Sequence, residues 1–278
     1  MQPWHSLSWS SSTSKSSKFN SKTPSSFGDS TQHRLKFELT ITQCDKTGLI
    51  SDISLTKVSD PVVSFDACND AAREGNVDRL RYAHENGCPW NEQTCEYAAM
   101  NGHLDCLQYA HENGCPWDKG TCIYAAMKGH LDCLQYAHEN GCPWNEQTCK
   151  CAAENGHLEC LQYAHENGCP WDKGTCEYAA MKGHLNCLQY AHENGCPWNE
   201  QTCECAAMRG HLECLQYAHE NGCPWNKDTC LSAATNGHLD CLKYARENGC
   251  PWNRGLCHQV AYYLRKYDVS SWIDLQPN

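Results

Sequence analysis

Cysteine and histidine recur at fixed positions in this chain, and both side chains can bind metal ions. The 278 residues include 24 cysteines and 15 histidines. One stretch of the pattern contains Cys88, Cys95, His103, Cys106 and His111, all of which are suitable zinc ligands. However, the sequence has no Cys-x-x-Cys and no His-x3–5-His, the close pairs that structural zinc sites commonly use. We therefore expect no metal and no cofactor, and we keep a metal-binding or thiol-buffering array as the alternative function.

A nucleophile and its base can also be drawn from the same residues, because Cys88 lies four positions after His84. This pair is copied along the chain. In its last copy Arg246 takes the place of the histidine, four positions before Cys250, so the base is missing there. Catalysis needs one pocket with an oriented base and a group that stabilises developing charge. A copied pair does not single out such a place, and no glycine-rich phosphate loop is present. The sequence therefore predicts that the protein is not an enzyme.

These columns of identical residues come from a repeat of 27 residues without insertions. The cysteine of the tetrapeptide Gly-Cys-Pro-Trp occupies positions 88, 115, 142, 169, 196, 223 and 250. A longer period is visible as well, since residues 91–144 and 145–198 differ at only six positions. That similarity indicates duplication of a pair of units, so an identical column is not by itself evidence of function.

Each unit is predicted to fold into two short helices joined by a turn. In the unit 91–117, Asn91 or Thr94 can cap a first helix that ends near Gly102. A second helix then runs from Leu104 to Gly114, with apolar residues along one face. Helices this short cannot bury their apolar face alone, whereas stacked neighbours can. The sequence therefore predicts an all-α solenoid of stacked helix–turn–helix units.

The two histidines of this unit have simple structural interpretations. His103 is expected at the start of the second helix as a structural residue. The run His111-Glu112-Asn113 is expected to be a solvated helix end.

The run from Ala98 to Leu104, Ala-Ala-Met-Asn-Gly-His-Leu, followed by Asn113 and Gly114, resembles the pattern of the ankyrin repeat family. The resemblance covers residues 65–268. Cys95 and Cys106 stand in columns that ankyrin repeats normally fill with leucine and valine in the core, so the resemblance implies that these thiols are buried. An ankyrin unit has about 33 residues, and the residues missing here lie where ankyrin repeats carry a β-hairpin finger. The resemblance implies a stacked helical groove that binds proteins, without the contacts that the full fingers make.

The chain outside the repeats is predicted to form three further segments. Residues 1–34 are rich in serine and read as a disordered tail, with an organelle-import peptide as the alternative. Residues 35–64 alternate apolar and polar side chains around a turn and are predicted to form a β-hairpin or a linker. The array at 65–268 is predicted to contain seven units and a capping helix over Leu256–Tyr267, followed by a tail at 269–278.

The differences between units concentrate on or beside the first helix, in the columns of Glu96, Tyr97, Met100 and Asn101 and in the turn at 92–93. The resemblance implies that this helix lines the concave face of the stack. Variation there suits a recognition surface, and drift at unconstrained surface positions is the alternative. The candidate partner-binding residues are Glu96, Tyr97, Met100, Ile123, Tyr124, Met127, Lys150, Glu154, Glu177, Met181, Glu204 and Met208.

Charge and hydropathy bear on the class of partner. The net charge of −11 argues against nucleic acid and against an anionic membrane as the main partner. No run of about 20 apolar residues is present, and the first residues lack the apolar core of a secretion signal. We expect a cytoplasmic protein, with the nucleus as the alternative, that acts as a non-catalytic scaffold for a protein partner.

Overall fold

The computed structural model describes residues 37–44, 50–57 and 66–277. The chain divides into two units, Met1–Val63 and Ser64–Asn278. In the first unit, strands β1 (Phe37–Cys44) and β2 (Ile50–Lys57) pair antiparallel, with Leu39 opposite Leu55. Both strands fall within the segment for which the sequence predicts a hairpin or linker. The serine-rich segment 1–34 lies outside the described residues.

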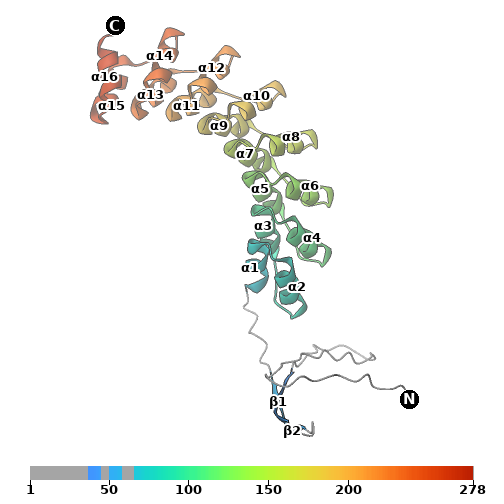
Figure 1. Ribbon diagram of the computed structural model, residues 1–278. Helices are drawn as coiled ribbons and strands as arrows, with labels where there is room; N and C mark the ends of the chain where they lie inside the picture. Colours follow the sequence, from blue (N-terminus) through green and yellow to red (C-terminus); the bar gives the residue numbers. More distant parts are fainter. Residues whose placement is uncertain (1–36, 45–49, 58–65, 278) are drawn as a thin grey trace. The chain divides into compact units, whose positions relative to one another are not determined.

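The second unit consists of helices that follow one another in pairs (Figure 1). The helices of the first four pairs are α1 (Ala67–Glu74), α2 (Val77–Glu85), α3 (Glu92–Met100), α4 (Leu104–Glu112), α5 (Lys119–Lys128), α6 (Leu131–Glu139), α7 (Glu146–Asn155) and α8 (Leu158–Glu166). Those of the last four are α9 (Lys173–Lys182), α10 (Leu185–Glu193), α11 (Glu200–Arg209), α12 (Leu212–Glu220), α13 (Lys227–Asn236), α14 (Leu239–Glu247), α15 (Arg254–Tyr263) and α16 (Tyr267–Asp274). The predicted helix–turn–helix solenoid is confirmed.

Local sequence signals fix where the helices begin and end. The side chain of Asn91, rather than Thr94, caps α3, because its Oδ1 accepts a hydrogen bond from the backbone N–H of Gln93 at 3.1 Å. Asp118 caps α5 in the same way, through the N–H of Gly120 at 2.8 Å. Gly129 ends α5 with a φ of 77°, a left-handed conformation that glycine adopts without steric cost.

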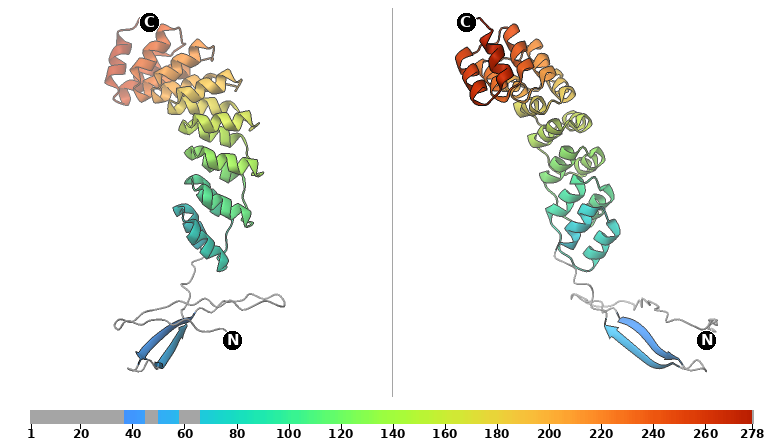
Figure 2. Two further views of the ribbon diagram at one scale, coloured as in Figure 1. Left: turned by 45° about the vertical axis from the view of Figure 1, so that its right-hand side comes forward. Right: turned by 60° about the vertical axis from the view of Figure 1, so that its left-hand side comes forward.

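The helices of the array form two rows. Successive odd-numbered helices pack closely against one another, and the even-numbered helices stand further apart. Figure 1 shows the odd-numbered helices on the concave side of the stack and the even-numbered helices on the convex side, and Figure 2 shows the same curved stack of helix pairs from two further directions. Small residues such as Ala98 and Ala99, both without exposed surface, allow the close approach of the first row. The described helices therefore present the first helix of each unit on the concave face, as the resemblance implied.

The core between the rows is filled by cysteine, alanine and leucine. Cys95, Cys106 and Leu107 are completely buried, and the equivalent residues of the following units are buried to within a few per cent. Burying a leucine side chain stabilises a protein by about 1.5–3 kcal/mol. Reduced cysteine behaves in such a core as a small apolar residue. The prediction that these cysteines occupy core positions is confirmed.

The end of the array differs from the predicted one. The sequence predicts a single capping helix over Leu256–Tyr267 and a tail from residue 269, whereas the structure has the two helices α15 and α16. Arg265 supplies the turn between them with a φ of 60°, one residue after the column in which internal units carry glycine and in which Leu264 stands here. The aliphatic chain of Lys266 lies over Gly237, in the position that histidine takes over the glycines of earlier units. The last pair is therefore a complete eighth helix pair.

Candidate partner-binding surface

The twelve candidate residues lie on α3, α5, α7, α9 and α11, the first helices of five successive units. All twelve are half-buried: none is sealed in the core and none is fully exposed. They occupy the face of each first helix that is not taken up by the buried alanine and cysteine columns. The structure therefore brings them together as one strip along the concave row of helices, which we call the concave strip.

Several residues of the concave strip contact residues of the neighbouring unit. The guanidinium of Arg73 lies 4.2 Å from the ring centroid of Tyr97, and the ammonium of Lys150 lies 4.2 Å from that of Tyr178. A cation at this distance from an aromatic ring is attracted to its face. These contacts join the variable positions of one unit to those of the next, which sequence reasoning did not find. The sequence carries no regular signal for them, because the two cations come from different columns: Arg73 from that of Met100 and Lys150 from that of Glu96.

Carboxylates and ammonium groups continue this pattern. Glu154 lies 3.5 Å from the ammonium of Lys182 in the next unit, and Ser232 donates a hydrogen bond to Glu204 at 3.2 Å. Burial raises the pKa of Glu96, and the neighbouring carboxyl group of Asp118 raises it further. The concave strip thus carries both signs of charge, at positions fixed by neighbouring side chains.

The histidines at the ends of the second helices are packed rather than solvated. The sequence suggests that His111 belongs to a solvated helix end, but its ring stacks on Trp117 with centroids 3.8 Å apart. Its Nδ1 atom is also hydrogen-bonded to the hydroxyl of Tyr136 in the next unit, at 2.9 Å. The solvated-end interpretation is therefore wrong for this histidine, although it holds for the exposed Glu112.

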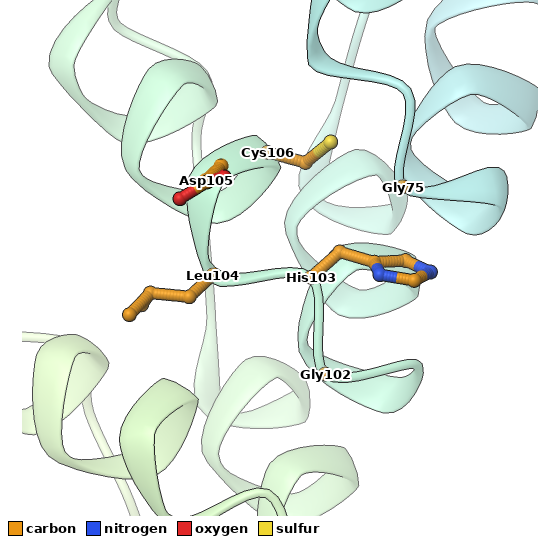
Figure 3. A pocket seen from close by; sticks show the side chains of 6 residues that line it. All are labelled: Gly75, Gly102, His103, Leu104, Asp105 and Cys106. Atoms are coloured by element: carbon orange, nitrogen blue, oxygen red, sulfur yellow. The ribbon is translucent and has the colours of Figure 1, made fainter.

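A shallow hollow of about 230 Å³ lies between the first two units of the array. Its lining includes Gly75, His103, Asp105 and Cys106 (Figure 3). His103 is directed towards the preceding unit, where its Nε2 atom is 3.2 Å from the carbonyl oxygen of Arg73. Figure 3 shows the side chain of Asp105 directed away from that of His103. The hollow therefore does not assemble an acid–base pair, and His103 has the structural place that the sequence suggests.

The cysteine side chains that the structure describes, from Cys68 to Cys257, are all buried thiols, and none forms a disulfide. Burial raises the pKa of Cys106 to about 11 and that of Cys133 to about 12. The thiolate is the form that attacks substrates and binds metals. At neutral pH these thiols are consequently protonated.

The cysteines of two columns also meet each other. The Cys95 thiol hydrogen-bonds with the Cys115 thiol of the same unit, and this contact together with burial raises the pKa of Cys95. Cys115 in turn donates to the backbone carbonyl of Asn91 at 3.3 Å. Between residues 66 and 277, no group of three or more Cys, His, Asp and Glu side chains is arranged to hold a metal ion.

The residues of the suggested nucleophile–base pair point to different partners. The Cys88 thiol hydrogen-bonds with the backbone carbonyl of Pro89 at 3.5 Å. The Nδ1 atom of His84 lies 3.1 Å from the hydroxyl of Tyr109. Both groups thus take part in the packing of the turn.

Across the described helices, none combines the length and apolar character needed to cross a membrane.

The comparisons with known proteins agree with this geometry. The family model described as "Ankyrin repeats (many copies)" matches residues 68–111, 122–165 and 176–219. No curated protein matches the sequence. Among solved structures, the chain is similar to the human ASB11 ankyrin repeat domain, with a TM-score of 0.50 and 18% sequence identity. That similarity covers 56% of this chain and 84% of the other, and at this identity it concerns the fold alone.

Proposed function

Since this chain is built of ankyrin repeats, which are generally protein–protein interaction modules, we propose that it is a non-catalytic scaffold. It binds a protein partner along the concave strip. The partner contacts the first helices of several successive units at once, because these helices form one continuous row. A compartment that keeps thiols reduced, such as the cytoplasm, suits a chain with 24 cysteines.

The observation that carries this proposal is where the units differ. Within one column of the concave strip, successive units present the anionic Glu96, the apolar Ile123 and the cationic Lys150. The core columns beneath them stay nearly constant, with alanine and cysteine buried throughout. Each unit thus presents a side chain of different charge or polarity on a helical framework that stays the same. A binding surface gains specificity from that kind of sequence of charges and apolar groups.

The framework also favours binding because it is already ordered. The contacts between Lys150 and Tyr178 and between Glu154 and Lys182 hold long side chains in place before a partner arrives. Immobilising a flexible side chain costs about 0.5–1.5 kcal/mol on association. Part of this cost is met when the array folds, so the concave strip loses less freedom on binding.

An affinity capture with paired variants tests the proposal. The first variant carries Ile123→Lys, Glu177→Lys and Glu204→Lys on the concave strip. Its control carries Asp132→Lys, Glu159→Lys and Glu213→Lys, exposed positions of the second helices. Both variants should keep the circular dichroism spectrum of the original chain. We expect the first variant to lose the partner that the original chain captures and the control to retain it. Equal capture by all three proteins would show that the concave strip is not the binding surface.

A further inference from the structure

A second surface of the array is built from aromatic and acidic side chains in a constant arrangement. One set consists of His138, Glu139, Trp144 and Tyr163. The rings of His138 and Trp144 stack with centroids 3.8 Å apart, and the Nδ1 atom of His138 lies 3.1 Å from the hydroxyl of Tyr163. We call the row of these sets the aromatic–acidic strip. Its six sets begin at His84, His111, His138, His165, His192 and His219.

The sets join from unit to unit. Helix α6 carries Tyr136, which meets Trp117 of the preceding unit, and also His138, which meets Tyr163 of the following unit. The stacking distances of all six sets lie between 3.7 and 3.8 Å. The strip is therefore continuous and rigid along six neighbouring units, and it lies at the turns rather than on the concave strip.

Packing between the units leaves one donor of each set unused. Trp144 is half-buried, and in the part of the chain with described side chains its indole N–H has no hydrogen-bond acceptor. This nitrogen is not among the buried polar atoms that lack a partner, so it is accessible to solvent. Pro143, directly before it, is exposed. Each set thus offers an accessible N–H donor beside apolar surface, the combination that aromatic-lined peptide grooves use.

Carboxylates accompany the aromatic residues in every set. Glu139 is exposed, and its charge lies close enough to Tyr163 to raise the pKa of that phenol, to which burial contributes more. Glu166 stands in the same relation to Tyr190 in the next set. Bases of single-stranded nucleic acid can stack on aromatic rows, but they require a positively charged path for the phosphates. A row of glutamates favours a cationic ligand instead.

The surface chemistry of the sets indicates which kind of chain fits. The second helices that carry the sets stand further apart than the first helices, so the accessible donors and the carboxylates recur at wide intervals along the array. A polyproline II helix is extended, rises about 3.1 Å per residue and leaves its own carbonyl groups free to accept hydrogen bonds. Grooves lined by aromatic residues bind proline-rich segments in this conformation. We propose that the aromatic–acidic strip binds a basic, proline-rich segment of a protein in the polyproline II conformation, which runs along successive units.

The two partners match in hydrogen bonding and charge. The carbonyl groups of a polyproline II helix have no internal hydrogen bonds, so they accept from the indole N–H of residues such as Trp144 and Trp171. Proline rings pack on the half-buried indoles, and arginine or lysine side chains pair with Glu139 and Glu166. Both surfaces are ordered before they meet, which lowers the entropic cost of association. This binding mode is independent of the concave strip.

The test uses the full chain and synthetic peptides of 18 residues. The first peptide repeats Pro-Pro-Arg, the second replaces the prolines with alanine and keeps the arginines, and the third replaces arginine with glutamate. Binding is followed by the fluorescence of the tryptophans and by calorimetry. We expect the first peptide to bind, the second to bind roughly tenfold more weakly, and the third not to bind. Equal affinity for the first two peptides would overturn the proposal, because only general charge attraction would remain.

Variants of the chain locate the site. The variant with Glu139→Gln, Glu166→Gln and Glu193→Gln should bind the first peptide about tenfold more weakly and with less dependence on salt. The matched control, Asp132→Asn with Glu159→Gln and Glu213→Gln, removes the same charge from exposed positions outside the strip and should bind as before. Trp171→Phe keeps an aromatic ring but removes the N–H donor, and it should also weaken binding. Equal weakening in the control, or none in the strip variants, would contradict the assigned surface.

Discussion

The Nδ1 atom of His111 lies 2.9 Å from the hydroxyl oxygen of Tyr136, and the two residues belong to neighbouring units. The same hydrogen bond recurs in all six sets, at 2.9–3.1 Å. It joins successive second helices, which otherwise stand further apart than the first helices. The bond therefore adds a directional connection where the stack has less apolar packing.

Removing one of these hydroxyls should destabilise the array. Tyr163→Phe leaves the Nδ1 atom of half-buried His138 without its partner. Loss of a hydrogen bond of this kind costs about 1 kcal/mol. The free energy of unfolding, measured in urea, should fall by roughly that amount. Tyr124→Phe is the matched control, since within the described side chains its hydroxyl makes no hydrogen bond, and it should leave stability unchanged. Equal losses for both variants would contradict the role of the His–Tyr bond.

Two glycines with similar backbone angles should differ in their response to alanine. Gly141 has a φ of 85° and open space where a Cβ would stand, so Gly141→Ala carries only the cost of a left-handed backbone, about 1–2 kcal/mol. Gly129 has a φ of 77°, but a Cβ there would lie 2.5 Å from the Nδ1 atom of His157. Crowding of a packed site costs a further 1–3 kcal/mol or so. Urea titrations of the two variants compare them directly, and equal losses would show that the His157 ring moves away freely.

The buried thiols predict a loss of stability at alkaline pH. Burial raises the pKa of Cys133 from 9.0 to about 12 and that of Cys187 from 9.0 to about 11. A raised pKa means that the folded state holds its proton more tightly than the unfolded state. The corresponding stability is complete below pH 9.0 and is lost as the pH rises towards the folded values of about 11 to 12. Urea midpoints in a reducing buffer should therefore fall steadily above pH 9.0.

A variant isolates the contribution of the thiols to this pH dependence. Replacing Cys133, Cys160 and Cys187 with alanine removes three of the groups whose pKa burial raises. The variant is expected to be less stable at neutral pH, because each substitution removes buried volume. Its stability should nevertheless decline less steeply above pH 9.0 than that of the original chain. An unchanged slope would assign the alkaline loss to other groups, such as the tyrosines.

The sequence predicted those features that depend on local signals and on the period. Asn91 and Gly102 mark the ends of a helix through their own backbone and side-chain preferences, so the helix pair could be placed from one unit. The cysteine column of Cys95 was correctly assigned to the core, because it shares a face with the alanines. These conclusions need no knowledge of how one unit is placed on the next.

Other features depend on contacts between units and were therefore missed. The packing of His111 requires Tyr136, twenty-five residues away, so a polar helix end was the natural but wrong interpretation. Lys150 and Tyr178 likewise stand in different columns, and only the stacking of one unit on the next brings their side chains together. Helix α16 was missed for a local reason. Its turn uses Arg265 at a φ of 60°, where a glycine would have marked the boundary.

Deleting residues 145–198 should leave a folded and shorter array. The deletion joins Trp144 to Asn199, which reproduces the Trp–Asn junction that the chain already has between Trp144 and Asn145. The new neighbour of α5 and α6 is the unit starting at Asn199, whose first helix resembles the deleted α7 in its cap and in its cysteine and alanine columns. No new kind of interface is formed.

The stability of a repeat array is approximately a sum over units and over the interfaces between neighbours. The shortened chain loses two units and two interfaces, so its urea midpoint should fall while unfolding remains a single cooperative transition. Its helical circular dichroism should decrease in proportion to the helices removed. A deletion of the same length shifted by nine residues, from 154 to 207, also keeps the period, and it joins two first helices within their length. If neighbouring units are interchangeable, this second chain should fold equally well, and failure of both chains would show that the order of the units matters to the fold.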